Sequence, residues 1–226
     1  EGVLDQAGTY RYLDEDGQER SGAAFVEPLY DNGSRRLLIP LMRRLMNEDK
    51  KVVVFRQSKG EAVACAVYLS QALGLPPAEA ALEQLGQNDA STSTQTLQRT
   101  LAGGVAFHNT DLDRDERRVI EEQFRDPVSP VRVVVATPTL AMGINTPAAA
   151  VAVIGLTHPG RLPTPYTVAE YKNMVGRAGR LGLTERGESY LIPEGSLDAH
   201  RAWSAYVNGQ PEDLISRLVP DGDPRS

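Results

Sequence analysis

The sequence predicts an α/β protein with a parallel sheet and helices on both of its faces. Three short apolar runs, which begin at Lys51, Val131 and Ala150, are rich in β-branched residues. Runs of this kind are typical of strands that are buried on both faces of a parallel sheet. Segments with the apolar spacing of helices separate these runs, so strands and helices alternate along the chain. This alternation is the pattern of a parallel α/β fold.

Length, composition and charge exclude several classes of function for this chain. Its 226 residues are enough for one large domain with a buried core. No apolar run approaches the length of a membrane span and no signal peptide opens the chain, so we expect a cytoplasmic protein without a membrane partner. The single Cys65 allows no internal disulfide and no cysteine-rich metal site. A formal charge of −6 argues against purely electrostatic binding of nucleic acid, although backbone amides and hydroxyls can still hold a strand.

The first residues do not continue the alternation of strands and helices. Tyr10 to Leu13, followed by the Asp16-Gly17 pair, predicts a β-hairpin. We treat residues 1–35 as a small N-terminal appendage, or as the end of a connection from another domain, and assign it no chemistry. Residues 36–195 are the predicted main domain.

The main domain begins with a predicted helix, strand and helix. Apolar spacing from Leu37 to Met46 indicates an amphipathic helix, and the strand 51–55 follows it. Ser58 and Glu61 form a capping box that begins the next helix. Ligands of α/β sheets bind at such strand ends and helix N-termini, so Gln57 and Ser58 are candidates for a phosphate contact. An ordinary connection between strand and helix explains the same residues equally well.

The next segment predicts connecting helices and then a further strand. Residues 75–104 have helical spacing without recognisable chemistry, and 105–107 indicate a short strand that ends at His108. Asp113 and Glu116 form another capping box at the start of a helix.

A third strand leads into a polar loop. Thr137 and Thr139 follow it, and hydroxyls at the carboxyl end of a strand can bind a nucleic-acid phosphate. Gly143 and Asn145 lie further along the loop. The backbone conformation of a turn could by itself account for a glycine and an asparagine there. The strand 150–156 comes next.

The stretch from Thr167 onward predicts another helix. Thr167 can cap its first amides, and Glu170 can reach back to the cap residue. The apolar face of this helix is formed by Val168, Tyr171, Val175 and Ala178.

Polar residues are predicted on the opposite face of this helix. Asn173, Arg177 and Arg180 follow one another at i, i+4 and i+7. Two fixed guanidiniums suit a polyphosphate, and Gly176 and Gly179 would let a bulky ligand approach closely. The alternative is a surface helix with solvated arginines.

The rest of the chain predicts a proline-rich loop, a last strand and a helical tail. The loop is 158–165 and the strand is 187–192. In the tail, residues 196–226, we expect one helix from Ser196 to Gly209 and a shorter one from Pro211 to Leu218.

Two of these stretches resemble known helicase motifs. YKNMVGRAGR (Tyr171 to Arg180) is similar to motif VI of superfamily-two helicases in the form used by the superkiller-like branch. ATPTLAMGINTPA (Ala136 to Ala148) is similar to motif V of that family. The resemblance runs from about Lys50 to Leu218. It implies a RecA-like parallel sheet that forms the second lobe of a two-lobe motor.

The resemblance also implies roles for single residues. Arg177 and Arg180 would be catalytic, as arginine fingers. Nucleotide contacts are implied for Gly143, Asn145, Asn173, Gly176, Arg177 and Arg180. Nucleic-acid contacts are implied for Gln57, Ser58, His108, Arg117, Thr137 and Thr139. The family usually has Gln at the position of Asn173.

The motifs that the chain lacks bear on its mechanism. ATP hydrolysis on this fold needs the phosphate loop G-x-x-x-x-G-K-[ST] and a pair of carboxylates that holds Mg²⁺, as in the DExH box. The sequence contains neither of these two motifs. We therefore expect the chain alone to be inactive, with ATP and Mg²⁺ held mainly by the first RecA-like lobe of the same polypeptide. The expected partner is single-stranded nucleic acid, and the similarity of YKNMVGRAGR and GESYLI to DNA-unwinding members favours DNA over RNA. The alternative is a non-catalytic module from a degenerate helicase that binds nucleic acid or a partner.

Overall fold

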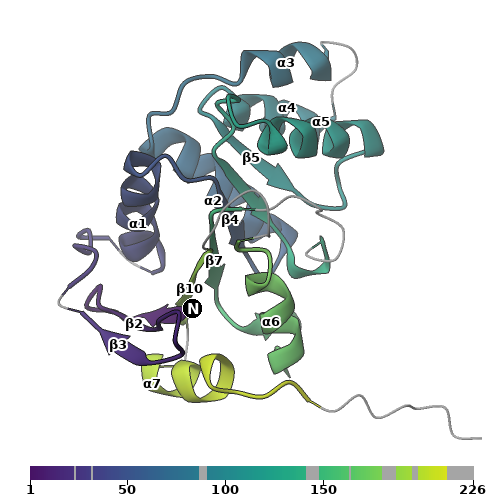
Figure 1. Cartoon of the computed structure of the whole chain (residues 1–226). Helices are drawn as coiled ribbons and strands as arrows, with labels where there is room; N and C mark the ends of the chain where they lie inside the picture. Colours follow the sequence, from purple (N-terminus) through teal and green to yellow (C-terminus); the bar gives the residue numbers. More distant parts are fainter. Residues whose placement is uncertain are drawn as a thin grey trace, which may run out of the picture.

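A large central sheet organises the computed structural model of the chain. The model describes residues 1–22, 24–31, 33–86, 91–140, 148–162, 164–179, 187–194 and 198–212. Within these ranges eight strands form one sheet in the order β3-β2-β1-β10-β7-β4-β6-β5 (Figure 1). Strands β8 and β9 form a separate pair.

The centre of the sheet is parallel, as predicted. Its strands are β10 (Glu188–Ile192), β7 (Ala150–Ile154), β4 (Val52–Phe55), β6 (Val133–Ala136) and β5 (Val105–His108). Every residue of β4, β6 and β7 is buried. Because successive side chains of a strand point to opposite faces, both faces of this sheet are covered. The predicted α/β fold with a RecA-like parallel sheet is confirmed.

Helices surround this sheet. They are α1 (Arg35–Asn47), α2 (Lys59–Ala72), α3 (Glu79–Leu85), α4 (Thr92–Leu101), α5 (Arg114–Arg125), α6 (Val168–Val175) and α7 (Ala199–Ala202). Figure 1 shows α3, α4 and α5 gathered near β5, while α7 lies beside the N-terminal strands. The capping boxes predicted for α2, α5 and α6 are all present. No helix in the described ranges is both long and apolar enough to cross a membrane.

The N-terminal hairpin is present and extends the main sheet. Strands β2 (Tyr10–Leu13) and β3 (Glu19–Ser21) pair antiparallel, as predicted. A further strand, β1 (Gly2–Leu4), pairs with β2 on one side and runs parallel to β10 on the other. Gly2 permits this approach, because a Cβ there would lie 2.2 Å from the carbonyl oxygen of Arg11. The hairpin is thus joined to the main sheet, and the division of the chain at residue 35 stays a prediction.

The first helix of the tail begins later than predicted. Helix α7 starts after Asp198, whose carboxylate accepts the backbone N–H of Arg201 over 2.8 Å. A π-helical turn, η2 (Trp203–Val207), follows α7. Ser196, the predicted start, lies outside the described residues, as does most of the helix predicted from Pro211 to Leu218.

The proline-rich segment contains a small hairpin where a loop was predicted. Strands β8 (Thr157–His158) and β9 (Thr164–Pro165) pair antiparallel. The prediction of a simple loop was wrong because two-residue strands carry no alternation of apolar and polar residues, which is the signal of a strand in a sequence. The hairpin begins just after the carboxyl end of β7, so it stands at the edge of the sheet where ligands of α/β folds bind.

Candidate functional site

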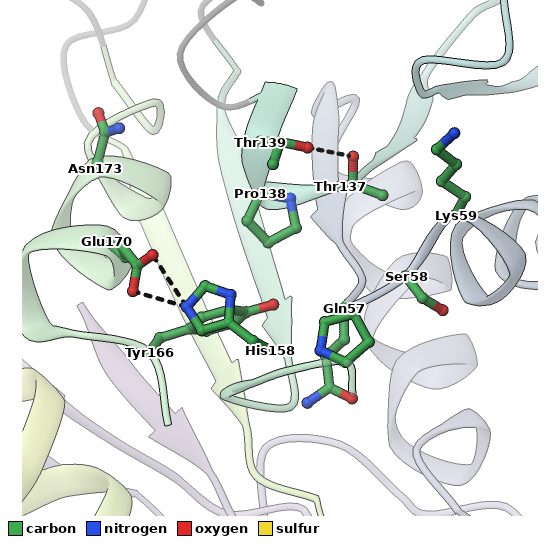
Figure 2. Close-up of a pocket in the computed structure, with 11 residues that line it drawn as sticks. Gln57, Ser58, Lys59, Thr137, Pro138, Thr139, His158, Tyr166, Glu170 and Asn173 are labelled. Carbon is green, nitrogen blue, oxygen red and sulfur yellow. Dashed lines mark hydrogen bonds and ion pairs between the residues drawn. The ribbon is translucent and has the colours of Figure 1, made fainter. Parts of the chain in front are cut away.

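A groove opens at the carboxyl ends of β4 and β6 and faces α6 (Figure 2). Its volume is about 450 Å³. Four segments line it: the turn after β4, the segment after β6, the β8–β9 hairpin with Tyr166, and α6. The lining residues are Gln57, Ser58, Lys59, Thr137, Pro138, Thr139, His158, Pro159, Tyr166, Glu170 and Asn173.

Gln57 is fixed in the groove between two strand ends. Its amide nitrogen donates to the hydroxyl oxygen of Thr157 over 2.6 Å, which ties the end of β4 to β8. Gly155 makes room for this side chain, because a Cβ there would lie 2.7 Å from the Gln57 amide nitrogen. Gly155 also has a φ of +72°, a conformation that favours glycine. The amide is therefore held in place before any ligand arrives.

Ser58 and Lys59 form the start of α2 on the groove wall. The Ser58 hydroxyl oxygen accepts the N–H of Glu61 over 3.3 Å, and the Glu61 carboxylate accepts the N–H of Ser58 over 3.0 Å. The Ser58 hydroxyl can still donate a hydrogen bond to another acceptor. The ammonium of Lys59 lies 2.5 Å from the carboxylate of Asp111. Both side chains are about half exposed, so this ion pair contributes little to stability.

Two threonines bring their hydroxyls together after β6. Thr137 follows the last residue of β6, and Thr139 lies in the short 3₁₀ turn η1 (Pro138–Leu140). Their hydroxyl oxygens are 3.2 Å apart, and the Thr137 residue is only 5% exposed (Figure 2). Paired hydroxyls at the end of a strand can donate hydrogen bonds to an anionic oxygen such as that of a phosphate.

The opposite wall carries an imidazole and a carboxylate. The Nε2 atom of His158 is 3.1 Å from Oε1 of Glu170, and the ring of Tyr166 meets the His158 ring edge-on with centroids 4.5 Å apart. Partial burial raises the pKa of Glu170, but the N–H of Thr167 and the His158 imidazole outweigh it, so the pKa is below its usual value. Glu170 is therefore an anion at neutral pH, and its carboxylate can accept a hydrogen bond from Nε2 of His158.

Helix α6 starts as predicted but ends earlier. Thr167 and Glu170 form the expected capping box, and Tyr171, Met174 and Val175 are buried. The last helical residue is Val175 and the cap is Gly176. Asn173 is on the helix and lines the groove.

Arg177 therefore lies in the turn after the helix. The prediction that it continues the helical face of Asn173 was wrong, because Ala178 forms an isolated bridge with Ala148 that draws the chain toward the sheet. Gly179 has a φ of +66°, so glycine is needed there for backbone conformation. Gly176 is exposed, and a Cβ there would lie 3.1 Å from the carbonyl oxygen of Lys172. Its contact with a nucleotide stays a prediction.

Three residues predicted to contact the nucleotide lie outside the described residues. They are Gly143, Asn145 and Arg180. Their roles stay predictions.

His108 lies outside the groove, and its side chain is in the interior. It is 2% exposed, and its Nε2 atom is 3.0 Å from a carboxylate oxygen of Glu121. Burial lowers the pKa of His108, aided by Arg117, and outweighs the opposing effect of Glu121. A neighbouring helix covers the imidazole in this structure, and the contact of His108 with a nucleic-acid strand stays a prediction.

Arg117 also lies away from the groove. Its Nε atom donates to the carbonyl of Asp113 at the start of the same helix over 3.1 Å. The side chain is partly exposed, so its contact with a strand stays a prediction.

Sequence reasoning missed one wall of the groove. His158, Pro159 and Tyr166 come from a segment without a recognised motif, and Glu170 was predicted only as part of a cap. Their contribution depends on how the hairpin folds back toward α6, which no local spacing reveals.

The parallel sheet, with a groove at the ends of its strands, defines a RecA-like α/β domain. Residues 35–182 match the model of the helicase conserved C-terminal domain, and the chain belongs to this family. The predicted superfamily-two helicase lobe is thereby confirmed.

Curated relatives agree with this assignment. The chain is similar to three proteins named ATP-dependent DNA helicase Hel308. Identity is 33% over 203 residues for that of Thermoplasma acidophilum, covering 88% of this chain and 29% of the relative. For the protein of Methanocella arvoryzae, identity is 34% over 189 residues, which cover 79% of this chain and 25% of the relative. For the protein of Pyrobaculum calidifontis, identity is 35% over 186 residues, which cover 78% of this chain and 26% of the relative. The chain thus spans less than a third of the length of these relatives.

Proposed function

We propose that the chain is the second motor lobe of an ATP-dependent nucleic-acid helicase or translocase, in the superkiller-like branch of superfamily two. One observation carries this proposal: Thr137 of the motif V stretch lines the same groove as Gln57, for which the resemblance implies a nucleic-acid contact. Asn173 of the motif VI helix lines it as well. The names of the relatives, ATP-dependent DNA helicases, support the motor assignment.

The groove is the proposed track for a single strand. Hydroxyls of Thr137 and Thr139, the Ser58 hydroxyl and the Gln57 amide can hydrogen-bond phosphate oxygens without reading the sequence of bases. We favour DNA over RNA, because the relatives are named DNA helicases and the motif VI region is similar to DNA-unwinding members. The −6 charge of the chain fits a lobe that holds phosphates by hydrogen bonds more than by excess positive charge.

Arg177 is the proposed link to the nucleotide. Its guanidinium is always charged and can hold phosphate oxygens with a fork of N–H groups. ATP with Mg²⁺ would be held mainly by the first RecA-like lobe, and it would supply the phosphoryl group. Arg177, with Arg180, would stabilise charge in the transition state, an effect of roughly 10³- to 10⁵-fold for arginine fingers in NTPases.

Helix α6 connects the two proposed sites. Glu170 and Asn173 on this helix line the groove, and Arg177 follows its last turn. A movement of the lobe that brings Arg177 to the nucleotide would also move this wall of the groove. Nucleotide state and grip on the strand would thus be linked, as a coupling between two sites requires.

The test is the ATPase rate of the full-length protein with and without single-stranded DNA or RNA. We expect hydrolysis that single-stranded DNA stimulates more than RNA of the same length, and no hydrolysis by residues 1–226 alone. Binding of DNA by the full-length protein without any ATP hydrolysis would support the alternative, a non-catalytic module. Hydrolysis by residues 1–226 alone would contradict the proposal directly.

A further inference from the structure

We propose that Glu212 is a positioning residue for Arg177, acting through the N-terminus of α6. The inference rests on the proposed function of Arg177. It assigns a role in the motor to the tail of the chain, which contains no helicase motif, and predicts how the tail affects ATP turnover.

The first observation is a carboxylate that completes the start of the helix. Oε1 of Glu212 accepts the N–H of Val168 over 2.8 Å, and Oε2 accepts the N–H of Ala169 over 3.1 Å. The next N–H, that of Glu170, is given to the hydroxyl of Thr167 over 3.1 Å. The first N–H groups of a helix have no acceptor within the helix. Glu212, a residue of the tail, supplies the acceptors for two of them. These backbone bonds also lower the pKa of Glu212, which keeps the carboxylate charged at neutral pH.

The second observation is that the same tail packs along the side of α6. The ring of Tyr206 meets that of Tyr171 with centroids 5.5 Å apart, and the Tyr206 hydroxyl donates to the carbonyl of Tyr166 over 2.9 Å. The ammonium of Lys172 donates to the carbonyl of Val207 over 2.9 Å. These contacts come from η2, five residues before Glu212 at its nearest. Contacts along the helix and at its end together set both the tilt of α6 and its position along its axis.

The third observation connects the end of the helix to Arg177. The N–H of Gly176 donates to the carbonyl of Lys172 over 2.9 Å, and the N–H of Arg177 donates to that of Met174 over 3.2 Å. The turn that carries Arg177 is therefore a continuation of the hydrogen bonds of α6. Helices this short depend on contacts outside themselves for their stability. Loss of the Glu212 carboxylate should let the first turn fray and the position of the guanidinium vary.

Such a loss has a specific kinetic consequence. If ATP is held mainly by the first lobe, a misplaced Arg177 weakens contacts made only in the transition state. The kcat and kcat/KM for ATP should then fall by the same factor while KM stays unchanged. Misplacement of a catalytic group by about 1 Å can cost up to about 100-fold in rate, and we expect a loss of about tenfold for Glu212→Gln.

The experiment compares Glu212→Gln with wild type in the full-length protein. We would measure kcat and KM for ATP at saturating single-stranded DNA, the Kd for that DNA, and the Tm. Glu79→Gln is the matched control, because Glu79 is an exposed carboxylate in the first turn of α3. Glu212→Asp is a second variant that keeps the charge and shortens the reach, and it should lie between wild type and Glu212→Gln. Unchanged kcat in both variants, or an equal loss in Glu79→Gln, would overturn the inference.

A double mutant separates this inference from the proposed function. In an Arg177→Ala background, Glu212→Gln should cause no further loss of kcat, because the two residues act in one route. An additive loss would contradict that route. If Arg177→Ala itself leaves kcat unchanged, the proposed function of the arginine fails. If only Glu212→Gln has no effect, the present inference fails and the function of Arg177 stands.

Discussion

Ala148 and Arg177 are joined backbone to backbone. The N–H of Ala148 donates to the carbonyl of Arg177 over 3.2 Å, and the carbonyl of Ala148 accepts the N–H of Gly179 over 3.0 Å. The turn after α6 is thereby attached to the segment that enters β7. The position of Arg177 depends on this attachment as well as on the helix before it.

Arg177→Lys should retain the charge but lose the forked geometry. Since a lysine ammonium lacks the rigid, planar fork of N–H groups of a guanidinium, we expect kcat for ATP to fall by about 10- to 100-fold, less than the loss for complete removal of an arginine finger. The measurement is steady-state ATP hydrolysis by the full-length protein at saturating single-stranded DNA. Arg99→Lys on the exposed side of α4 is the control and should leave kcat unchanged. Wild-type turnover in Arg177→Lys would mean that only charge matters there.

Thr137→Val and Thr139→Val together should weaken binding of single-stranded DNA. Valine keeps the shape of threonine and removes the hydroxyl, and a hydrogen bond to a charged group contributes about 1.5–3 kcal/mol. We therefore expect the Kd to rise at least about tenfold. Fluorescence anisotropy with a labelled oligonucleotide measures this at fixed salt, with Thr96→Val on α4 as the control. An unchanged Kd with an intact fold would show that the strand does not use this wall.

Thr167→Ala should destabilise the protein through α6. It removes the hydroxyl that accepts the N–H of Glu170, and loss of such a cap costs about 1 kcal/mol. The free energy of unfolding in urea measures the effect. Thr96→Ala is the comparison, because Thr96 lies at a partly exposed helix position where alanine has the higher helix propensity, so its effect should be near zero or stabilising. Equal effects of the two substitutions would contradict a capping role for Thr167.

Stability should fall on mild acidification because of His108. Burial holds the pKa of this side chain below the value of about 6.5 that it has in the unfolded chain. As the pH falls below about 6.5, the unfolded chain binds a proton that the folded chain does not, so the free energy of unfolding decreases until the pH reaches the folded pKa. His108→Gln should reduce this decrease between pH 7 and 5. The same slope in wild type and variant would show that other groups cause it.

The parallel sheet could be predicted because its signals are local. Val52 to Phe55 are apolar and β-branched or aromatic without interruption, and the structure buries all four. The caps of α2, α5 and α6 were also predictable, since each needs only two residues three positions apart. Most residues that line the groove follow from these elements, because the ends of parallel strands meet at one edge of the sheet.

The features that were not predicted depend on contacts between distant parts of the chain. Strand β1 has only three residues and is defined by its pairing with β10. The end of α6 is set by the bridge from Ala178 to Ala148, while the spacing of Asn173 and Arg177 alone favours a longer helix. His108 ends a predicted strand, where exposure is common, but Glu121 from α5 covers it.

The most direct measurement is single-turnover ATP hydrolysis by full-length Arg177→Ala, with binding of single-stranded DNA measured on the same sample. If this lobe completes a nucleotide site built mainly by another, hydrolysis should fall by at least about 10³-fold while DNA still binds with wild-type affinity. Hydrolysis at the wild-type rate would contradict the account, because the fold would then contribute no charge to the reaction through this turn.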